Sequence, residues 1–458
     1  MKIGLLPLYF HGYDESSPHV RPRLEAFYEE IAELFVERQM TVEKSGFCRL
    51  KSEFEQTVMK FEQAGVDAIV TLHMAYSPSA ESVEVLASTS LPIIVLDTTQ
   101  TLEFTPMQDP GEVMYNHSVH GVIEMCNMLK RYGKPYAIAA GHYRESDCID
   151  RVCGHVRAAA TATALQKAHV GILGGAVESI GDLTVDPKEI KERFHITVEK
   201  MDPRLLALLR QELTQEELTA EKIENTERFA FDTQIKQEEY EQALMDGLAL
   251  RGCIREKGYT AITANVQKIG PEAGLDTMPF IEICKAMERG IGYAGEGDVL
   301  NAAFNGALLA SYPDTGFVEI FCPDWKNDMV FLSHTGEVNF RIVDGTPFVC
   351  CSGKAVDKRN PYAGYARMKG GKGVYVNIIR GKDDYQLLLS PAEMVSFDTD
   401  NFPRSICGWM KPAQGSVAEF LEALSNNGAS RHSSFVYGAT VEELIFMGSL
   451  LSLKTVVI

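Results

Sequence analysis

The sequence predicts an α/β protein: two doubly wound parallel-sheet domains followed by a C-terminal antiparallel β domain. Over the first two thirds of the chain, strand-like apolar runs alternate with helix-like segments, which favours parallel sheets with helices on both faces. From about residue 315, short β-like runs are separated by Gly, Asp, Asn and Pro, a pattern typical of antiparallel strands. The expected domains are residues 1–165, 166–314 and 315–458.

In the first domain, buried runs predict the strands and acidic periodic segments predict the helices. The expected strands are 2–9, 66–73, 91–97 and 136–142, and the expected helices include 22–38 and 117–132.

The second domain repeats this alternation. Its expected strands are 170–175 and 259–264, a strongly acidic helical region covers 203–250, and a helix at about 299–311 follows Asp298, a suitable N-cap.

The third domain opens with two apolar runs, 317–322 and 329–334, joined by a turn-like segment. Further β-like runs lie at 338–343, 347–351, 373–379 and 385–390. A last helix at about 441–452 begins with a capping-box pattern, Thr440 and Glu443.

Charge and composition exclude several classes of function. The 458 residues carry a formal net charge of −19, which argues against nucleic acid or an anionic membrane as a partner. The apolar start, Met1–Phe10, is too short to span a membrane and precedes no signal-cleavage pattern, so a cytoplasmic location is expected. The ten cysteines lack metal-type spacing and are expected to be reduced thiols. No dinucleotide fingerprint or nucleophile elbow is present.

Two charged or polar residues stand out in the paired apolar runs of the third domain. Glu319 interrupts the first run and His334 ends the second. A carboxylate in an apolar strand is costly unless it is paired or bound to a cation. A symmetric hairpin centred between Lys326 and Asn327 places Glu319 opposite His334, with Cβ atoms roughly 4.5–5.5 Å apart. The ordinary alternatives are a buried salt bridge and a hydrogen-bonded core histidine.

Two further residues complete a candidate metal site. Glu296 lies between two glycines in a strand-to-helix turn, and His432 lies in what reads as a polar loop, Ser430–Ser434. Two carboxylates and two imidazoles suit a divalent metal with oxygen and nitrogen ligands. An exposed loop acid and a loop histidine are the ordinary alternatives.

A second set of histidines lies in the first domain. His73 and His142 end expected strands, and His117 and His120 lie at the start of a helix. Ligands of doubly wound sheets bind beyond the carboxyl ends of the strands. Helix capping or a core hydrogen bond would explain each histidine equally well.

With these residues the chain resembles the L-arabinose/L-fucose isomerase family over nearly its whole length. The segment Tyr293–Asp298 is similar to the one that bears the family's first catalytic glutamate, and Glu319 falls where the second lies. Leu332–His334 is similar to the strand with the first histidine ligand. Arg431 and His432 match a late His-His pair whose second histidine binds metal, with Arg431 in place of the first.

Upstream, the resemblance is carried by the first domain. Leu72–His73 with Tyr76–Pro78 is similar to a sugar-lining segment, and His117–Gly121 is similar to a Gln-Thr-Ala-His-Gly segment. His117 departs from the glutamine, and His120 is the counterpart of a histidine that reaches a neighbouring subunit's site. The resemblance therefore implies substrate binding by His73, Tyr76, His117 and His120. It also implies a homo-oligomer, a trimer or hexamer, with sites at subunit interfaces.

The function that the resemblance implies is aldose–ketose isomerisation, an intramolecular oxidoreduction in carbohydrate metabolism. Glu296 and Glu319 would act as acid and base across a cis-enediol(ate), and Glu296, Glu319, His334 and His432 would bind Mn²⁺ or another divalent metal. The alternatives are a metal-dependent sugar epimerase and a non-catalytic sugar-binding protein. L-Arabinose, L-fucose and C6-modified hexoses, including sulfonated ones, all remain open as substrates.

Overall fold

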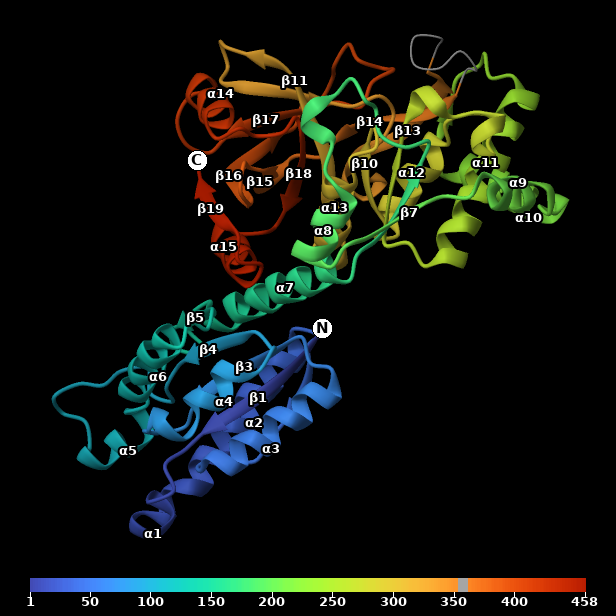
Figure 1. Cartoon of the computed structure of the whole chain (residues 1–458). Helices are drawn as coiled ribbons and strands as arrows, with labels where there is room; N and C mark the ends of the chain where they lie inside the picture. Colours follow the sequence, from blue (N-terminus) through green and yellow to red (C-terminus); the bar gives the residue numbers. More distant parts are fainter. Residues whose placement is uncertain (353–360) are drawn as a thin grey trace. The chain divides into compact units, whose positions relative to one another are not determined.

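The computed structural model describes residues 1–352 and 361–458, which form two compact units (Figure 1). Unit 1 consists of residues 1–160 and 442–452, and unit 2 consists of residues 161–441 and 453–458. No helix in the described residues is long and apolar enough to cross a membrane.

Unit 1 is built on a five-stranded parallel sheet in the order β2-β1-β3-β4-β5. The strands are β1 (Lys2–Leu8), β2 (Thr41–Lys44), β3 (Ala68–His73), β4 (Ile93–Asp97) and β5 (Tyr136–Ala140). The chain turns back after β2, so β1 and β3 are neighbours whose connections leave in opposite directions. The carboxyl ends of β1 and β3 therefore flank the switch point at which such sheets bind ligands.

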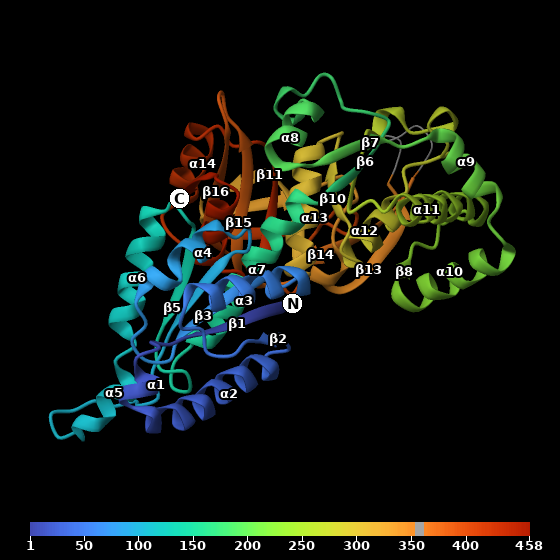
Figure 2. The same cartoon turned by 60° about the horizontal axis from the view of Figure 1, so that its bottom comes forward.

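Helices cover both faces of this sheet, because right-handed crossovers change face where the strand order reverses. Three helices share one core cluster with β1, β3 and β4: α3 (Lys51–Ala64), α4 (Val83–Ser88) and α6 (Val119–Arg131). The crossover rule places α2 (Arg21–Glu37) on the other face (Figure 2). Unit 1 also holds α1 (Tyr13–Ser16), α5 (Val113–Asn116), the start of α7 (Cys148–Gln166) and most of α15 (Val441–Leu450).

Unit 2 opens with a four-stranded parallel sheet in the order β10-β9-β6-β7. Its strands are β6 (His169–Leu173), β7 (Thr197–Lys200), β9 (Ala261–Ala264) and β10 (Gly292–Gly295). The predicted helical region 203–250 is three helices around a short strand β8 (Ala230–Phe231): α9 (Pro203–Gln211), α10 (Gln215–Arg228) and α11 (Gln237–Lys257). The remaining helices here are α8 (Pro187–Phe194), α12 (Phe280–Glu288) and α13 (Val299–Ser311). Asp298 caps α13 as predicted, since its side chain accepts from the Asn301 N–H at 3.0 Å.

The rest of unit 2 is an antiparallel barrel. Strands pair in the order β15-β18-β11-β12-β17-β16, and β16 pairs back to β15 to close the sheet, while β19 adds parallel to β16. These strands are β11 (Thr315–Asp324), β12 (Met329–Ser333), β15 (Gly371–Arg380), β16 (Tyr385–Val395), β17 (Gly408–Pro412), β18 (His432–Tyr437) and β19 (Lys454–Val457). A small sheet joins β13 (Val343–Cys351), β14 (Tyr362–Met368) and β8, and α14 (Val417–Asn426) precedes β18.

Two parallel sheets followed by an antiparallel barrel confirm the predicted fold class. The domain limits 1–165, 166–314 and 315–458 stay predictions. One predicted strand, 338–343, is wrong: Phe340–Ile342 form a 3₁₀ turn, and β13 begins only at Val343. The Asn339 side chain accepts from the Arg341 N–H at 3.0 Å, and this local hydrogen bond replaces a strand ladder.

Candidate active site

Three neighbouring barrel strands bring Glu319, His334 and His432 together. Glu319 in β11 pairs directly with His432 in β18, and on its other side β11 pairs with β12, after which His334 follows. One ligand atom from each residue lies within 4.8 Å of the other two. Both histidines are buried, and the Glu319 side chain is 13% exposed. The structure therefore places three of the four predicted metal residues around one point.

The predicted opposition of Glu319 and His334 is wrong by one residue. The symmetric register holds near the turn, where Asp324 pairs with Met329, but an irregularity between Ile320 and Cys322 shifts it. Glu319 therefore faces Ser333, and His334 lies just beyond the strand end. The His334 Nε2 is still 3.9 Å from the Glu319 Oε2, because a one-residue shift at a strand end leaves the imidazole within reach.

The prediction that His432 lies in a polar loop is also wrong. His432 begins β18 and has no exposed surface. Its serine neighbours read as loop residues, yet their hydroxyls have partners inside the barrel. Ser433 Oγ donates to the Tyr375 hydroxyl at 2.5 Å, and Ser434 Oγ accepts from Asn305 Nδ2 at 3.1 Å. Tertiary hydrogen bonds make a polar strand stable there.

A carboxylate fixes each histidine from behind. His432 Nδ1 lies 3.0 Å from an Asp298 oxygen, and His334 Nδ1 lies 2.6 Å from a Glu337 oxygen. Glu337 is itself held by the Tyr293 hydroxyl at 2.6 Å. Carboxylate contacts at Nδ1 leave Nε2 of each ring for a ligand, as is usual for metal-binding histidines.

Sequence reasoning recognised Asp298 only as a helix cap, and it missed Glu337 and Tyr293. The available signal for Glu337 was a carboxylate three residues after a candidate histidine. Burial opposes ionisation of Glu337, but the adjacent His334 lowers its pKa overall. A carboxylate kept ionised at this position can hold the imidazole in a single orientation.

The donor set fits a divalent metal. Among the described residues, the buried Nε2 of His432 has no hydrogen-bond partner, since the nearest Glu296 oxygen is 3.5 Å away. Burial lowers the pKa of His432, but the Asp298 and Glu296 carboxylates outweigh this and raise it to about 9. A metal at this site would replace the proton on that nitrogen.

The absent side chain of Gly295 leaves room for the His334 imidazole. A Cβ on Gly295 would lie 2.8 Å from the Cε1 atom of His334, closer than side-chain atoms approach. The Phe317 ring packs edge-on against both imidazoles, with centroids 4.8 Å from His334 and 4.9 Å from His432. Phe317 and Glu319 are two residues apart on β11 and so face the same side.

Glu296 lies in a tight turn between β10 and α13. Its backbone has φ = 63°, in the left-handed region that only glycine adopts readily. Gly297 follows with φ = 89°, and a Cβ there would lie 2.3 Å from the Ala176 Cα. The turn is anchored by the Glu296 N–H, which donates to the Ala264 carbonyl at 2.9 Å, and by the Glu296 carbonyl, which accepts from Val177 at 3.0 Å.

The Glu296 carboxylate lies beside the three-residue cluster but outside it. Its Oε2 contacts an Arg431 guanidinium nitrogen, and a second nitrogen of Arg431 is 3.5 Å from Glu319 Oε1. Burial raises the pKa of Glu296, but His432 and Arg431 lower it overall. One arginine thus joins the two candidate catalytic carboxylates.

In unit 1, His73 lies at the carboxyl end of β3, beside the switch point. It is 2% exposed, and neither ring nitrogen has a hydrogen-bond partner among the described residues. Burial lowers its pKa to about 3, so the ring is neutral. The absent side chain of Gly121 makes space for it, since a Cβ there would lie 3.0 Å from the His73 ring.

The other three predicted substrate residues form a linked aromatic group in unit 1. Tyr76 stacks on His120 with centroids 4.7 Å apart, and His120 neighbours His117 at 5.4 Å. The Tyr76 hydroxyl donates to Glu124 at 3.1 Å, and His117 Nε2 lies 3.0 Å from the Tyr13 hydroxyl. His142, by contrast, follows β5, and its Nε2 lies 3.4 Å from the Gln100 carbonyl.

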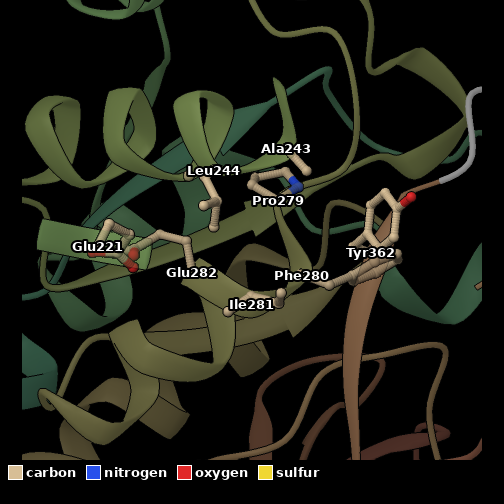
Figure 3. Close-up of a pocket in the computed structure, with 9 residues that line it drawn as sticks. Glu221, Ala243, Leu244, Pro279, Phe280, Ile281, Glu282 and Tyr362 are labelled. Atoms are coloured by element: carbon tan, nitrogen blue, oxygen red, sulfur yellow. The ribbon is translucent and has the colours of Figure 1, made fainter. Parts of the chain in front are cut away.

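A second group of buried carboxylates in unit 2 is structural. Figure 3 shows Glu221 and Glu282 close together at one end of a pocket lined also by Tyr362. The pocket holds about 10 Å³, room for one water at most. Glu221 pairs with Lys285 at 2.7 Å and with Arg251 at 2.8 Å, and Arg251 also contacts Glu282. Burial raises the pKa of Glu221, but the two cations lower it overall. These acids hold helices together rather than transfer protons.

Comparisons with known proteins point to one family. Residues 176–310 match the family described as L-arabinose isomerase central domain. The L-arabinose isomerase of Erwinia tasmaniensis is 24% identical over 358 residues, covering 75% of this chain and 70% of that protein. The L-arabinose isomerase 2 of Bacillus licheniformis is 24% identical over 369 residues, covering 77% of this chain and 76% of that protein.

Among solved structures, an ABC transporter periplasmic solute binding protein from Actinobacillus succinogenes with bound D-allose covers 68% of this chain and 91% of its own, at 13% identity. Its TM-score of 0.18 is too low to support an argument about fold or function. The family match and the relatives, which span most of both chains, agree with each other. The chain is thus similar to L-arabinose isomerases over most of its length, and residues 176–310 match their central domain.

Proposed function

We propose that this protein is a metal-dependent aldose–ketose isomerase. The observation that carries the proposal is the convergence of Glu319, His334 and His432 within 4.8 Å, with the Glu296 carboxylate beside them. The similarity to L-arabinose isomerases over most of the chain supports the same reaction class. A binding module needs no second carboxylate beside such a cluster, so a non-catalytic sugar-binding role is the weaker reading.

Glu319, His334 and His432 would hold the metal. The resemblance implies Glu296 as a fourth ligand, and its carboxylate lies beside these three residues. A mixed oxygen and nitrogen donor set suits manganese. A bound divalent ion supplies positive charge to sugar oxygens on which negative charge develops. The Asp298 and Glu337 contacts keep both imidazoles aimed at the same point.

Glu296 and Glu319 would share the proton transfers. Isomerisation needs a base to move a proton between carbons 1 and 2, and an acid to supply one to an oxygen, through a cis-enediol(ate). Two carboxylates can divide these roles when their surroundings differ. Here they do, because Glu296 sits in a turn with its side chain 27% exposed, while Glu319 sits in a barrel strand and is 13% exposed.

The unit 1 group would bind the sugar. His73, Tyr76, His117 and His120 offer ring nitrogens and an aromatic face, which suit hydroxyl groups and the apolar face of a sugar ring. By resemblance we propose that this group completes the site of a neighbouring subunit in a homo-oligomer, and that the enzyme acts in the cytoplasm.

The test is a screen of aldoses with added Mn²⁺, followed by proton NMR. Formation of a ketose supports the proposal; inversion at one carbon without ketose would instead indicate an epimerase, and sugar binding without conversion a binding protein. Glu296→Gln and Glu319→Gln should each lower kcat/KM by roughly 10²–10⁴ while the fold is retained. Glu393→Gln, an exposed change on β16, is the matched control. Native turnover in either site variant would refute the acid–base assignment.

A further inference from the structure

Arg431 engages both candidate catalytic carboxylates, but it uses their oxygens differently. On Glu319, Arg431 approaches Oε1 at 3.5 Å, whereas His334 faces Oε2 at 3.9 Å. On Glu296, Arg431 contacts Oε2, which is also the oxygen nearest to His432 Nε2, at 3.5 Å. Glu319 can therefore bind the guanidinium through one oxygen and a metal through the other. On Glu296, the oxygen that contacts Arg431 is the same one that a metal would need.

We propose that Arg431 holds Glu296 out of the metal's coordination sphere, so that this chain binds its metal through Glu319, His334 and His432 alone. The inference rests on the proposed metal-dependent function. It explains why the three-residue cluster excludes Glu296, although Glu296 lies beside it. Three protein ligands leave positions on the metal for sugar oxygens.

The chemistry of the guanidinium favours this division. An arginine is always charged and presents its donors in a rigid fork, so it can hold two carboxylates in a fixed arrangement. The Nε of Arg431 is buried and has no hydrogen-bond partner among the described residues. The polar contacts of this side chain are thus concentrated on Glu296 and Glu319.

The backbone also holds Arg431 in place. The residue directly precedes His432, which is paired with Glu319 in the barrel, and its own N–H donates to Asp182 at 3.1 Å. The family that this chain resembles has the first of two histidines at the position of Arg431. The contact between Arg431 and Glu296 therefore depends on a residue that is particular to this chain. Held by Arg431, the Glu296 carboxylate lies beside the metal position without binding to it.

The test is a double-mutant cycle on metal binding, which needs no substrate. Mn²⁺ alone is titrated by calorimetry into the native protein, Arg431→Gln, Glu296→Gln and the double variant, with bound metal counted by elemental analysis. We expect Glu296→Gln alone to leave the Mn²⁺ Kd within about twofold of the native value, the scatter of uncoupled sites. Arg431→Gln should tighten Mn²⁺ roughly 10-fold or more, since neighbours of metal ligands alter affinity by about 10–100-fold.

The double variant should not show this increase in Mn²⁺ affinity and should have the native Kd, because the Arg431→Gln change acts by freeing Glu296 to bind the metal. Arg341→Gln is the control, since Arg341 pairs with Asp314 at 3.1 Å with similar exposure. If Arg431→Gln does not fold, Arg431→Lys gives the same comparison with a smaller gain, because lysine lacks the fork.

Two results would overturn the inference while leaving the proposed function intact. One is a Glu296→Gln protein that binds Mn²⁺ about 10-fold more weakly than the native protein, as loss of a true ligand requires. The other is a double variant that binds as tightly as Arg431→Gln. A native protein that binds no Mn²⁺ would overturn the metal site itself and, with it, the role of Arg431.

Discussion

Gly295→Ala tests whether the space for His334 sets the geometry of the metal site. The added Cβ would lie 2.8 Å from His334 Cε1 and 3.1 Å from Nε2. Carbon atoms pack at about 3.5–4.0 Å, so the ring must move by at least about 0.7 Å. Metal–ligand distances tolerate only about 0.2 Å.

The imidazole cannot retreat freely, because Glu337 holds its Nδ1 at 2.6 Å and Phe317 packs against the ring. We therefore expect Gly295→Ala to weaken Mn²⁺ binding by roughly 10–100-fold. Overpacking should lower the free energy of unfolding by about 1–3 kcal/mol. Calorimetric titration measures the first effect and urea denaturation of the metal-free protein the second.

Gly46→Ala is the matched control, since a Cβ at Gly46 meets nothing within 4 Å. It should leave the Mn²⁺ Kd unchanged. If Gly295→Ala binds Mn²⁺ as tightly as the native protein, then either His334 is no ligand or the ring has more freedom than its contacts indicate. The reasoning from steric space to metal affinity would then be wrong.

Three further predictions concern other buried polar groups. Lys285→Met strips a buried ion pair of its cation and should lower the free energy of unfolding in urea by about 3–5 kcal/mol, whereas Lys236→Met, at an exposed pair, should cost under about 1 kcal/mol. Glu337→Gln should weaken Mn²⁺ binding roughly 10–100-fold, because His334 loses the carboxylate that orients it; an unchanged Kd would remove that role. His73 has a pKa of about 3 in the fold against 6.5 when exposed, so only the unfolded chain takes up its proton at pH 5. The native protein should therefore lose about 2 kcal/mol of stability between pH 7 and pH 5 that His73→Leu does not lose, as urea denaturation at both pH values can show.

The central strands of the parallel sheets were predictable from the sequence because they are buried on both faces, whereas the edge strands Thr41–Lys44 and Thr197–Lys200 are partly exposed and were missed. Runs such as Ala68–His73 and Ile93–Asp97 are continuous apolar stretches that need no tertiary knowledge to recognise. The strands of the barrel were harder to predict. β17, β18 and β19 were missed, and β18 in particular begins His-Ser-Ser, which is stable because Tyr375 and Asn305 hydrogen-bond to its hydroxyls. Such partners come from distant parts of the chain and leave no local pattern.

In the candidate site, too, locally visible features were predictable and features that depend on distant residues were not. Glu319 and His334 were found because a polar residue in an apolar run is locally visible, yet their register was wrong by one, since the irregularity after Ile320 depends on how β11 meets its neighbours. Glu296 and His432 entered through the family resemblance. Glu337 was missed, because a carboxylate near a histidine becomes informative only when both are seen to be buried.

The two candidate catalytic carboxylates differ in the backbone that carries them, and this difference matches the division of roles proposed here. Glu319 is held by strand pairing on both sides, as a metal ligand requires. Glu296 occupies a left-handed conformation that costs a non-glycine residue about 1–2 kcal/mol, and only the surrounding turn enforces it. A strained conformation retained next to a metal site points to a function that regular backbone would not serve. Placing a carboxylate beside the metal, but under the control of Arg431, is such a function.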